Sequence, residues 1–321
     1  MAAIGTDIAL AQVFLESGQL VGIPTETVYG LAGNALNAES VALIFETKNR
    51  PSFDPLILHT FALERVEEFV SDFPEKLKLL AKKFWPGPLT LLLPRKPIVP
   101  DLVTSGLDRV AVRVPDHPLT LTLLKQLDFP LAAPSANPFG YISPTQAKHV
   151  EAQLGEKIPY ILDGGSCEVG LESTIVGMEG EELVVYRLGG LEISAIENLV
   201  GPVKVKDHSS SNPAAPGQLD SHYAPRKPFI LGDLNTLIAE KHAEGVDFAV
   251  LSFSDVFTTI AKEKQSALSL SRDIHEAAKN LFSAMRKLDE GNSVVILAEL
   301  LPEDGLGRAI NDRLRRASAK G

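Results

Sequence analysis

The chain has 321 residues, of which 45% are hydrophobic and 22% charged. This balance is typical of a soluble globular protein with one large or two ordinary domains. No apolar run approaches the roughly 18 residues of a membrane helix. A single cysteine, Cys167, excludes a disulfide framework and a zinc site of several cysteines. No basic residue precedes Lys48, so neither a signal peptide nor an arginine-rich transit peptide is visible, and we expect a cytoplasmic protein.

The net charge of −10 is unevenly distributed. Residues 1–202 contain 15 basic and 25 acidic residues, whereas residues 203–321 contain 16 of each. The acidic first part argues against a broad nucleic-acid-binding surface there. Any basic cluster in that part therefore needs a local explanation.

The first 190 residues alternate irregularly between predicted helices and strands. Hydrophobic periodicity predicts helices at 7–17, 40–48, 63–70, 74–84, 119–127 and 145–154, with Thr6 or Asp7 capping the first and Thr145 the last. Strands are predicted at 20–23, 56–59, 89–93, 110–114, 131–133 and 160–163. Residues 173–178 and 183–188, joined through Glu179-Gly180, have the pattern of a hairpin. These elements predict an α/β domain with a mixed twisted sheet, not a pure Rossmann domain.

The composition changes after residue 204. Ser209-Ser210-Ser211-Asn212-Pro213 and further prolines at 216, 225 and 228 are typical of a linker. Strands at 229–231, 248–252 and 294–298 then alternate with helices at 234–244, 271–289 and 306–317, which predicts a second, smaller parallel α/β (Rossmann-like) domain. No G-x-G-x-x-G follows its first strand, so it lacks a dinucleotide fingerprint. We therefore divide the chain into domains at 1–203 and 229–321 with a linker at 204–228.

Residues 22–30 (GIPTETVYG) are unusually polar for the end of a buried strand. Pro24 ends the strand because it has no N–H to donate. Two threonines, a glutamate and a tyrosine follow, where a plain turn favours glycine, asparagine or aspartate. Open α/β proteins build ligand sites from such strand ends. The alternative is structural, with Thr25 or Thr27 as a helix cap and Tyr29 in the core.

Further polar residues stand beside apolar strands. Arg113 is the most informative, because an arginine centred in a short strand must reach an anion or the sheet edge. For Arg113 alone, a structural ion pair is an equal alternative. For the whole set, guanidinium groups and hydroxyls favour phosphate binding. His59 alone is more typical of a core histidine, and Cys167 of a buried small hydrophobe than of a nucleophile. The set is Thr25, Thr27, Lys48, Arg50, His59, Arg109, Arg113, Ser135, Asn137, Ser143, Ser173, Thr174 and Arg187.

Seven short motifs carry a resemblance to a known family. They are Pro24–Leu31 (PTETVYGL), Lys48–Pro51 (KNRP), Pro55-Leu56 with His59, Phe84–Thr90 (FWPGPLT), Val112–Pro115 (VRVP), Pro134–Asn137 (PSAN) and Glu172–Ile175 (ESTI). In this order they resemble the Sua5/YrdC family of threonylcarbamoyl-AMP synthases over residues 1 to about 190. His222–Pro225 (HYAP), followed by a small α/β unit, resembles the longer, two-domain Sua5 subtype.

The resemblance implies a nucleotidyltransferase reaction. L-Threonine, bicarbonate and ATP, with Mg²⁺, would give threonylcarbamoyl-AMP and pyrophosphate. Other proteins would then transfer the threonylcarbamoyl group to adenosine in tRNA, forming N6-threonylcarbamoyladenosine. By motif, the threonine site would be Thr27, His59, Arg113 and Ser173. The ATP site would be Arg50, Asp54, Arg109, Ser135, Asn137, Ser143, Arg187 and Tyr223, with Lys48 and Arg50 as catalytic cations and the metal ligands unknown.

The residue types suit this chemistry. The carbamate of threonine and ATP are both anionic, so positive charge must hold them together, and Mg²⁺ would share this work. No covalent nucleophile is required, which agrees with a sequence that has no Cys–His or Ser–His–Asp signature. The carboxylate of threonine is the natural partner of Arg113.

Several positions depart from the family pattern. Asn49 stands where glycine is frequent, Asp54 where asparagine is usual, and Phe139 where serine is frequent. Ala215–Leu219 (APGQL) also differs from the usual Ser-Pro-Gly-Met run. Asp54 matters most, because a carboxylate beside ATP repels phosphate unless it faces adenine, a ribose hydroxyl or Mg²⁺.

Two other functions compete with this interpretation. Hydrogenase-maturation carbamoyltransferases share the first domain but add cysteine zinc fingers, which one cysteine cannot supply. A tRNA- or double-stranded-RNA-binding module without catalysis is disfavoured by the acidic first part. The run Arg308, Arg313, Arg315 and Arg316 is instead interpreted as an ordinary helix C-terminus, where the helix dipole favours cations.

The linker is predicted to act as a lid. Its middle contains His222 and Tyr223, and a passive spacer needs no aromatic side chain. We expect Tyr223 to fold back over the first domain and contact ATP, which would exclude water from a hydrolysable adenylate. The alternative is that Tyr223 packs on the second domain.

Overall fold

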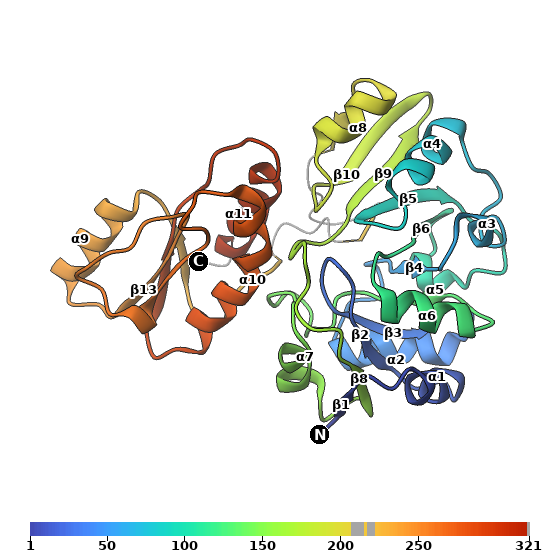
Figure 1. Ribbon diagram of the computed structural model, residues 1–321, viewed down its shortest axis with the longest axis horizontal. Helices are drawn as coiled ribbons and strands as arrows, with labels where there is room; N and C mark the ends of the chain where they lie inside the picture. Colours follow the sequence, from blue (N-terminus) through green and yellow to red (C-terminus); the bar gives the residue numbers. More distant parts are fainter. Residues whose placement is uncertain (207–214, 217–221, 320–321) are drawn as a thin grey trace.

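The computed structural model describes residues 1–206, 215–216 and 222–319, which form two joined lobes (Figure 1). The first contains an eleven-stranded mixed sheet in the order β1-β8-β2-β3-β7-β4-β6-β5-β9-β10-β11. The strands are β1 (Ala3–Gly5), β2 (Val21–Ile23), β3 (Gly30–Asn34), β4 (Ile57–His59), β5 (Leu89–Pro94), β6 (Arg109–Arg113), β7 (Leu131–Ala132), β8 (Tyr160–Leu162), β9 (Thr174–Glu179), β10 (Glu182–Arg187) and β11 (Lys204–Val205).

Alternation along the strands divides the first lobe into two faces. In β4, Leu58 belongs to the larger core, whereas its neighbour Ile57 belongs to a cluster on the opposite face. The larger core includes side chains of α2 (Ala38–Lys48), α4 (Glu75–Phe84), α5 (Asp101–Thr104), α7 (Ala147–Leu154) and α8 (Ile193–Val200). On the other face, α1 (Ile8–Glu16) and α6 (Pro118–Gln126) pack on the β1–β7 half of the sheet.

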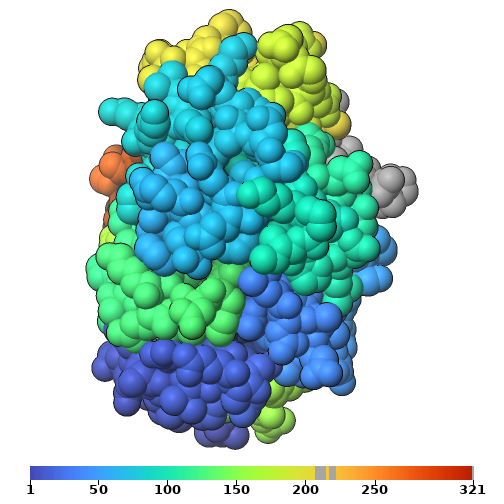
Figure 2. All heavy atoms as spheres, turned by 90° about the vertical axis from the view of Figure 1, so that its right-hand side faces the viewer, coloured from blue at the N-terminus to red at the C-terminus, as the bar shows by residue number. Residues whose placement is uncertain are grey.

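The outer surface of this lobe is covered by helices. Figure 2 shows the chain around α1 at the base, α6 above it, and the region of α3 (Leu63–Val66) and α4 higher on the same face. Asp7 caps α1 by accepting a hydrogen bond from Leu10 N, as predicted. The α2 helix ends at Asn49, which adopts the left-handed conformation at φ 51°. Within the described ranges, no helix is long and apolar enough to cross a membrane.

The second lobe is a four-stranded parallel sheet in the order β12-β15-β13-β14. Its strands are β12 (Phe229–Leu231), β13 (Phe248–Ser252), β14 (Gln265–Ala267) and β15 (Val295–Ala298). Its helices are α9 (Leu234–Glu244), α10 (Ile274–Glu290) and α11 (Gly307–Ser318), with a short 3-10 turn at Lys262–Lys264.

The α10 and α11 helices face the first lobe (Figure 1). Tyr141 Oη donates to Asp289 Oδ2 of α10 at 2.6 Å. Arg286 of the same helix is buried and donates to the carbonyl oxygens of Ser143, at 3.2 Å, and Ile142. Together with a shared hydrophobic cluster, these bonds make the two lobes one packed unit.

The predicted fold class is confirmed, but some elements differ from the sequence prediction. The helix expected at 63–70 ends at Val66, because the chain then turns and Val70 bridges to Arg95 beside β5. The α7 helix starts at Ala147 with Gln146 as its N-cap, so Thr145 is not the cap. Lys204–Val205, assigned to the linker, forms β11 beside β10. The serine run 209–211 of the linker lies outside the described residues. Other elements had no clear sequence signal: β1, β3, β11, β14, α5 and α8.

Candidate functional site

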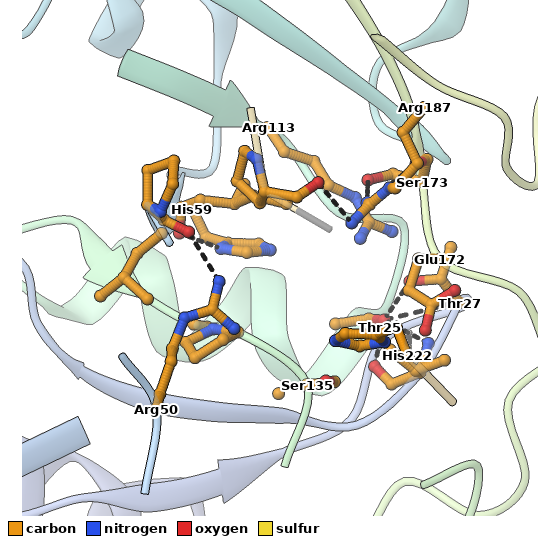
Figure 3. Close-up of a pocket in the computed structure, with 18 of the residues that line it drawn as sticks. Thr25, Thr27, Arg50, His59, Arg113, Ser135, Glu172, Ser173, Arg187 and His222 are labelled. Carbon is orange, nitrogen blue, oxygen red and sulfur yellow. Dashed lines mark hydrogen bonds between the residues drawn. The ribbon is translucent and has the colours of Figure 1, made fainter. Parts of the chain in front are cut away.

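A pocket with about 600 Å³ of empty space, part of it open to solvent, lies where the linker meets the first sheet. Figure 3 shows cationic and hydroxyl side chains from several segments facing one another around it. Its polar lining is Thr25, Thr27, Arg50, His59, Arg113, Ser135, Glu172, Ser173, Arg187, His222 and Tyr223, and its apolar and backbone lining is Val28, Gly30, Pro55, Leu56, Ile57, Ala133, Pro134 and Pro216.

The polar stretch after β2 forms one wall as a tight turn. Thr25 Oγ1 donates to Val28 O at 2.7 Å, accepts from Thr27 N at 3.1 Å, and lies 2.8 Å from Thr27 Oγ1. A strand follows, so Thr25 closes a turn instead of capping a helix. Tyr29 is fully buried and its hydroxyl donates to Gly165 O at 2.7 Å. The turn therefore holds the Thr27 hydroxyl at the pocket.

His59 and Arg113 lie side by side because β4 and β6 are parallel neighbours and these residues are partners in register. Alternation turns both side chains away from the larger core, toward the linker. Arg113 Nη2 donates to Glu26 Oε1 at 2.6 Å, and its Nε donates to Gly87 O at 3.2 Å. The sequence left two partners open for Arg113, a ligand anion or a carboxylate of the protein. The structure shows the second, Glu26, and Arg113 also lines the pocket.

His59 is a neutral imidazole near neutral pH. Burial, with the positive charge of Arg113, lowers the pKa of His59 to about 3. Its Nδ1 lies 3.1 Å from Ile57 O, which fits a hydrogen bond from the neutral ring. With its proton on Nδ1, the neutral His59 ring can accept a hydrogen bond at Nε2 in the pocket without adding charge.

The opposite wall is built by Ser173 and Arg187. Arg187 donates from Nε and Nη2 to Ser173 O, at 3.0 and 2.9 Å, and from Nη2 to Ser173 Oγ at 3.0 Å. Thr90 Oγ1 lies 2.7 Å from the same Ser173 hydroxyl. Burial lowers the pKa of Arg187 to about 10, so it remains a cation at neutral pH. This wall presents a fixed hydroxyl beside a buried charge.

The basic end of the pocket contains Arg50, with Lys48 behind it. Arg50 donates to Asp54 O at 3.0 Å and Pro55 O at 2.8 Å, and its Nη2 lies 2.9 Å from Asp54 Oδ2. This ion pair holds the buried Asp54 carboxylate, which has no hydrogen-bond donor besides it among the described residues. Lys48 is not a lining residue: its Nζ donates to the carbonyl oxygens of Ser135, at 2.5 Å, and Asn137. Burial, with Arg50, lowers the pKa of Lys48 well below its usual value.

The structure brings eight of the predicted site residues to the pocket and leaves five outside its lining. Arg109 lies at the start of β6, about 13 Å of strand from Arg113, and donates to Tyr186 Oη at 2.9 Å and Met178 O at 3.2 Å. Ser143 donates to Glu172 Oε1 at 2.5 Å. The residues in the lining are Thr27, Arg50, His59, Arg113, Ser135, Ser173, Arg187 and Tyr223; those outside it are Lys48, Asp54, Arg109, Asn137 and Ser143.

The described linker residues contact both lobes: Arg226 and Lys227 donate to Asp289 of α10, whereas earlier residues lie against the first lobe. Ala215 is buried in the cluster that contains Ile57, and Ala224 N donates to Gly140 O at 2.9 Å. Tyr223 lines the pocket and also stacks on Phe282 of α10, with ring centroids 5.6 Å apart. Tyr223 was predicted either to fold over the first domain or to pack on the second. The structure shows both contacts, because one ring touches both lobes.

Two further observations limit the chemistry of the site. Burial raises the pKa of the Cys167 thiol to about 12, so this cysteine is not an activated nucleophile. Among residues 1–206, 215–216 and 222–319, no group of three or more histidine, cysteine, aspartate or glutamate side chains is placed to hold a metal ion.

Sequence reasoning did not assign roles to three residues of the site. Glu26 pairs with Arg113, Glu172 pairs with Arg313 of α11, and His222 lines the pocket. Glu26 and Glu172 both belong to recognised motifs and directly precede residues that were assigned, Thr27 and Ser173. The sequence did contain a signal for these two residues. An acidic residue in a motif rich in anion-binding side chains indicates a partner for a buried arginine.

Comparisons with known proteins show the family of this chain. Residues 13–189 match the Sua5/YciO/YrdC family model, described as "Telomere recombination", and residues 191–319 match "Threonylcarbamoyl-AMP synthase, C-terminal domain". The threonylcarbamoyl-AMP synthase of Pyrococcus abyssi is 40% identical over 97% of this chain and 94% of its own length. That of Bacillus subtilis is 39% identical over 97% and 92%.

Solved structures give the same result. The crystal structure of P. abyssi Sua5 complexed with L-threonine superposes with a TM-score of 0.91 and 40% identity, covering 97% of this chain and 94% of that one. The crystal structure of full-length HypF shares only the fold, at 20% identity and a TM-score of 0.51 over 57% of this chain. The fold and the cation-lined pocket thus define a Sua5/YciO/YrdC-type α/β enzyme. Within that class, the chain belongs to the two-domain threonylcarbamoyl-AMP synthase family, which confirms the resemblance seen in the sequence.

The lowered pKa of His59 makes stability depend on pH. Its unfolded pKa is near 6.5 and its folded pKa about 3, so stability is complete above pH 6.5 and is lost as the pH falls toward 3. A single such group contributes a slope of about 1.4 kcal/mol per pH unit. Between pH 6.5 and 5, the free energy of unfolding measured by urea denaturation should fall by about 1.5 kcal/mol less in His59→Gln than in wild type.

His149 provides a parallel test in another part of the lobe, because burial, with Arg286 and Lys148, lowers its pKa to about 4. In His149→Gln, the free energy of unfolding should also fall less than in wild type as the pH decreases. The double variant of His59 and His149 should show the sum of both effects. Curves that superpose on wild type for both single variants would contradict neutral, buried imidazoles.

Proposed function

We propose that this protein synthesises threonylcarbamoyl-AMP from L-threonine, bicarbonate and ATP, releasing pyrophosphate. The observation that carries this proposal is one pocket lined by three arginines, Arg50, Arg113 and Arg187, with the hydroxyls of Thr27 and Ser173 between them. Such a set suits a substrate with a carboxylate, an amine and a hydroxyl beside a polyphosphate. The relatives of similar length carry the name of this activity, and one was solved with L-threonine bound.

In the proposed complex, threonine lies between Thr27, His59, Arg113 and Ser173. Its carboxylate takes the exposed part of the Arg113 fork, beside or in place of Glu26. The neutral imidazole of His59 and the two hydroxyls form hydrogen bonds with the amine and the side-chain hydroxyl. The amine nitrogen is carboxylated by bicarbonate, with loss of water, and this orientation directs the resulting carbamate along the pocket toward the nucleotide.

The carbamate oxygen then attacks the α-phosphorus of ATP as pyrophosphate departs. Attack and departure both involve anions, so cations that are already in place lower the barrier without reorganisation. Arg50, Ser135 and Arg187 hold the phosphates from the pocket walls. Magnesium would come with ATP, because it keeps mostly phosphate and water ligands in such sites. Asp54 lies outside the pocket lining and pairs with Arg50 at 2.9 Å, so its carboxylate orients Arg50 and would reach Mg²⁺ or the ribose only through a movement of this loop.

The predicted residues outside the lining support the loops of the site. Lys48 holds the Ser135–Asn137 loop through its carbonyl oxygens, and Asn137 donates from Nδ2 to Tyr141 O at 2.8 Å. Arg109 can contact ATP only if the nucleotide extends along β6, and Ala215 of the linker packs on this part of the strand. ATP entry would then accompany movement of the linker, as the lid hypothesis requires.

The product is an activated threonylcarbamoyl group, which we place upstream of tRNA modification by separate transfer proteins in the cytoplasm. An RNA-binding module is the second candidate, but no specific observation favours it. The pocket is small compared with an RNA backbone, and the first lobe carries an excess of acidic residues.

Pyrophosphate release tests this proposal. It should require ATP, bicarbonate and L-threonine together, and L-serine should be a poor substitute. A pocket shaped around one methyl group discriminates by about 1–3 kcal/mol, or roughly 10- to 200-fold in kcat/KM. Equal rates with serine, or release that does not depend on the amino acid, would refute the threonine assignment.

Arg113→Lys should separate the two half-sites. Lysine keeps the charge but cannot reach Glu26 and a substrate carboxylate with a planar fork. L-Threonine affinity should fall by about tenfold or more in calorimetry, while ATP affinity stays nearly unchanged. Lower ATP affinity with unchanged threonine affinity would show that the half-sites are interchanged.

A further inference from the structure

A buried arginine of the second lobe reaches the wall of the pocket. Arg313 lies in α11, is 0% exposed, and donates from Nε and Nη2 to Glu172 Oε2 at 3.2 and 3.0 Å. Its Nη1 donates to Asp312 Oδ2 at 2.8 Å. Glu172 lines the pocket and directly precedes Ser173. A charge of the second lobe thus lies immediately behind the site.

The Glu172 carboxylate joins three segments. Its Oε1 accepts from Ser143 Oγ at 2.5 Å, while Oε2 accepts from Arg313. Its backbone carbonyl accepts from Gly190 N at 2.8 Å, which fixes the chain just before β9. Because each carboxylate oxygen has a separate partner, the position of the Ser143 hydroxyl depends on where Arg313 holds Glu172.

Arg313 also fixes the aromatic ring that the linker contributes. Its guanidinium carbon lies 5.1 Å from the centroid of Tyr223, and that of Arg316 lies 4.8 Å away. Phe282 of α10 stacks on the same ring at an interplanar angle of 27°. The face of Tyr223 is therefore held by cations and an aromatic ring of the second lobe while Tyr223 lines the pocket.

The ion pair remains charged in the interior. Burial alone raises the pKa of Glu172, but Arg313 and Arg187, with the Ser143 hydrogen bond, lower it to below its usual value. For Arg313, burial lowers the pKa, but Tyr223, Glu172 and Asp312 outweigh this effect and raise it. A buried pair of this kind leaves an uncompensated charge when one partner is removed.

We propose that Arg313 is a positioning residue for the ATP half of the pocket, acting through Glu172 on Ser143 and directly on Tyr223. The second lobe is then part of the site and not only a neighbour of it. This inference rests on the proposed function and on the ATP contacts that the resemblance implies for Ser143 and Tyr223; Tyr223 lines the pocket, and Ser143 lies directly behind its wall on Glu172. The threonine half has its own supports within the first lobe: Arg113 is held by Glu26 and Gly87, and the Ser173 hydroxyl by Thr90 and Arg187.

Calorimetry on the full chain tests this split. Arg313→Gln should raise the Kd of ATP by about tenfold or more, since small displacements of positioning groups have large effects. The Kd of L-threonine should change by less than about twofold, as expected for uncoupled sites. Arg313→Lys restores the charge and one donor, and should recover part of the ATP affinity.

The matched control is Arg315→Gln on the same helix, whose ion pair with Glu303 is exposed; both affinities should stay at wild-type values. Glu172→Gln combined with Arg313→Gln should weaken ATP binding no more than the worse single variant, because both act through one contact. Circular dichroism establishes folding. If Arg313→Gln does not fold, Arg313→Lys decides, and it must weaken ATP binding alone.

The outcomes separate the two claims. Wild-type protein that does not bind ATP would refute the proposed function. Wild-type protein that binds ATP, with unchanged ATP affinity in Arg313→Gln and Arg313→Lys, would overturn the inference about Arg313. Equal weakening of ATP and L-threonine would also overturn it, because Arg313 would then only support the fold.

Discussion

The pocket depends on the pairing of charges in a buried environment. Arg113, Arg187 and Arg313 have little or no exposed surface, and an unpaired ion there costs several kcal/mol. Glu26 compensates Arg113, Glu172 compensates Arg313, and Arg187 is held by the Ser173 carbonyl. The acidic residues of the two motifs therefore determine which segments can approach one another.

This pairing has a consequence for substrate binding. Glu26 holds Arg113 in place before any substrate arrives, so a carboxylate that reaches Arg113 meets a guanidinium that is already oriented. The cost of binding is then mainly the rearrangement of one ion pair, not the ordering of a long side chain. On the other wall, Glu172 connects the start of β9 to α11, so the two lobes and the linker enclose one volume.

Local sequence patterns predicted much of the fold but not its long-range pairs. The apolar pattern predicted a buried strand around Arg113, and the motifs assigned Arg113 and His59 to one site. The structure places the two residues side by side as register partners. Arg109 lies in the same strand but outside the pocket. The alternation of side chains predicts which face of a strand a residue lies on, not which end of the strand forms the site. Glu172 and Arg313 are separated by 141 residues, and many carboxylates could have compensated either arginine. Elements with weak periodicity, such as β3 (GLAGN), depend on tertiary packing for their formation.

The central claim is that the pocket joins threonine, bicarbonate and ATP into one adenylate. Mass spectrometry of the product formed with ¹³C-bicarbonate tests this most directly, because the carbon of the carbamoyl group comes only from bicarbonate. The account predicts an adenylate that contains threonine and is heavier by one ¹³C than the product from unlabelled bicarbonate. Only AMP or ADP, or an adenylate without the label, would contradict it.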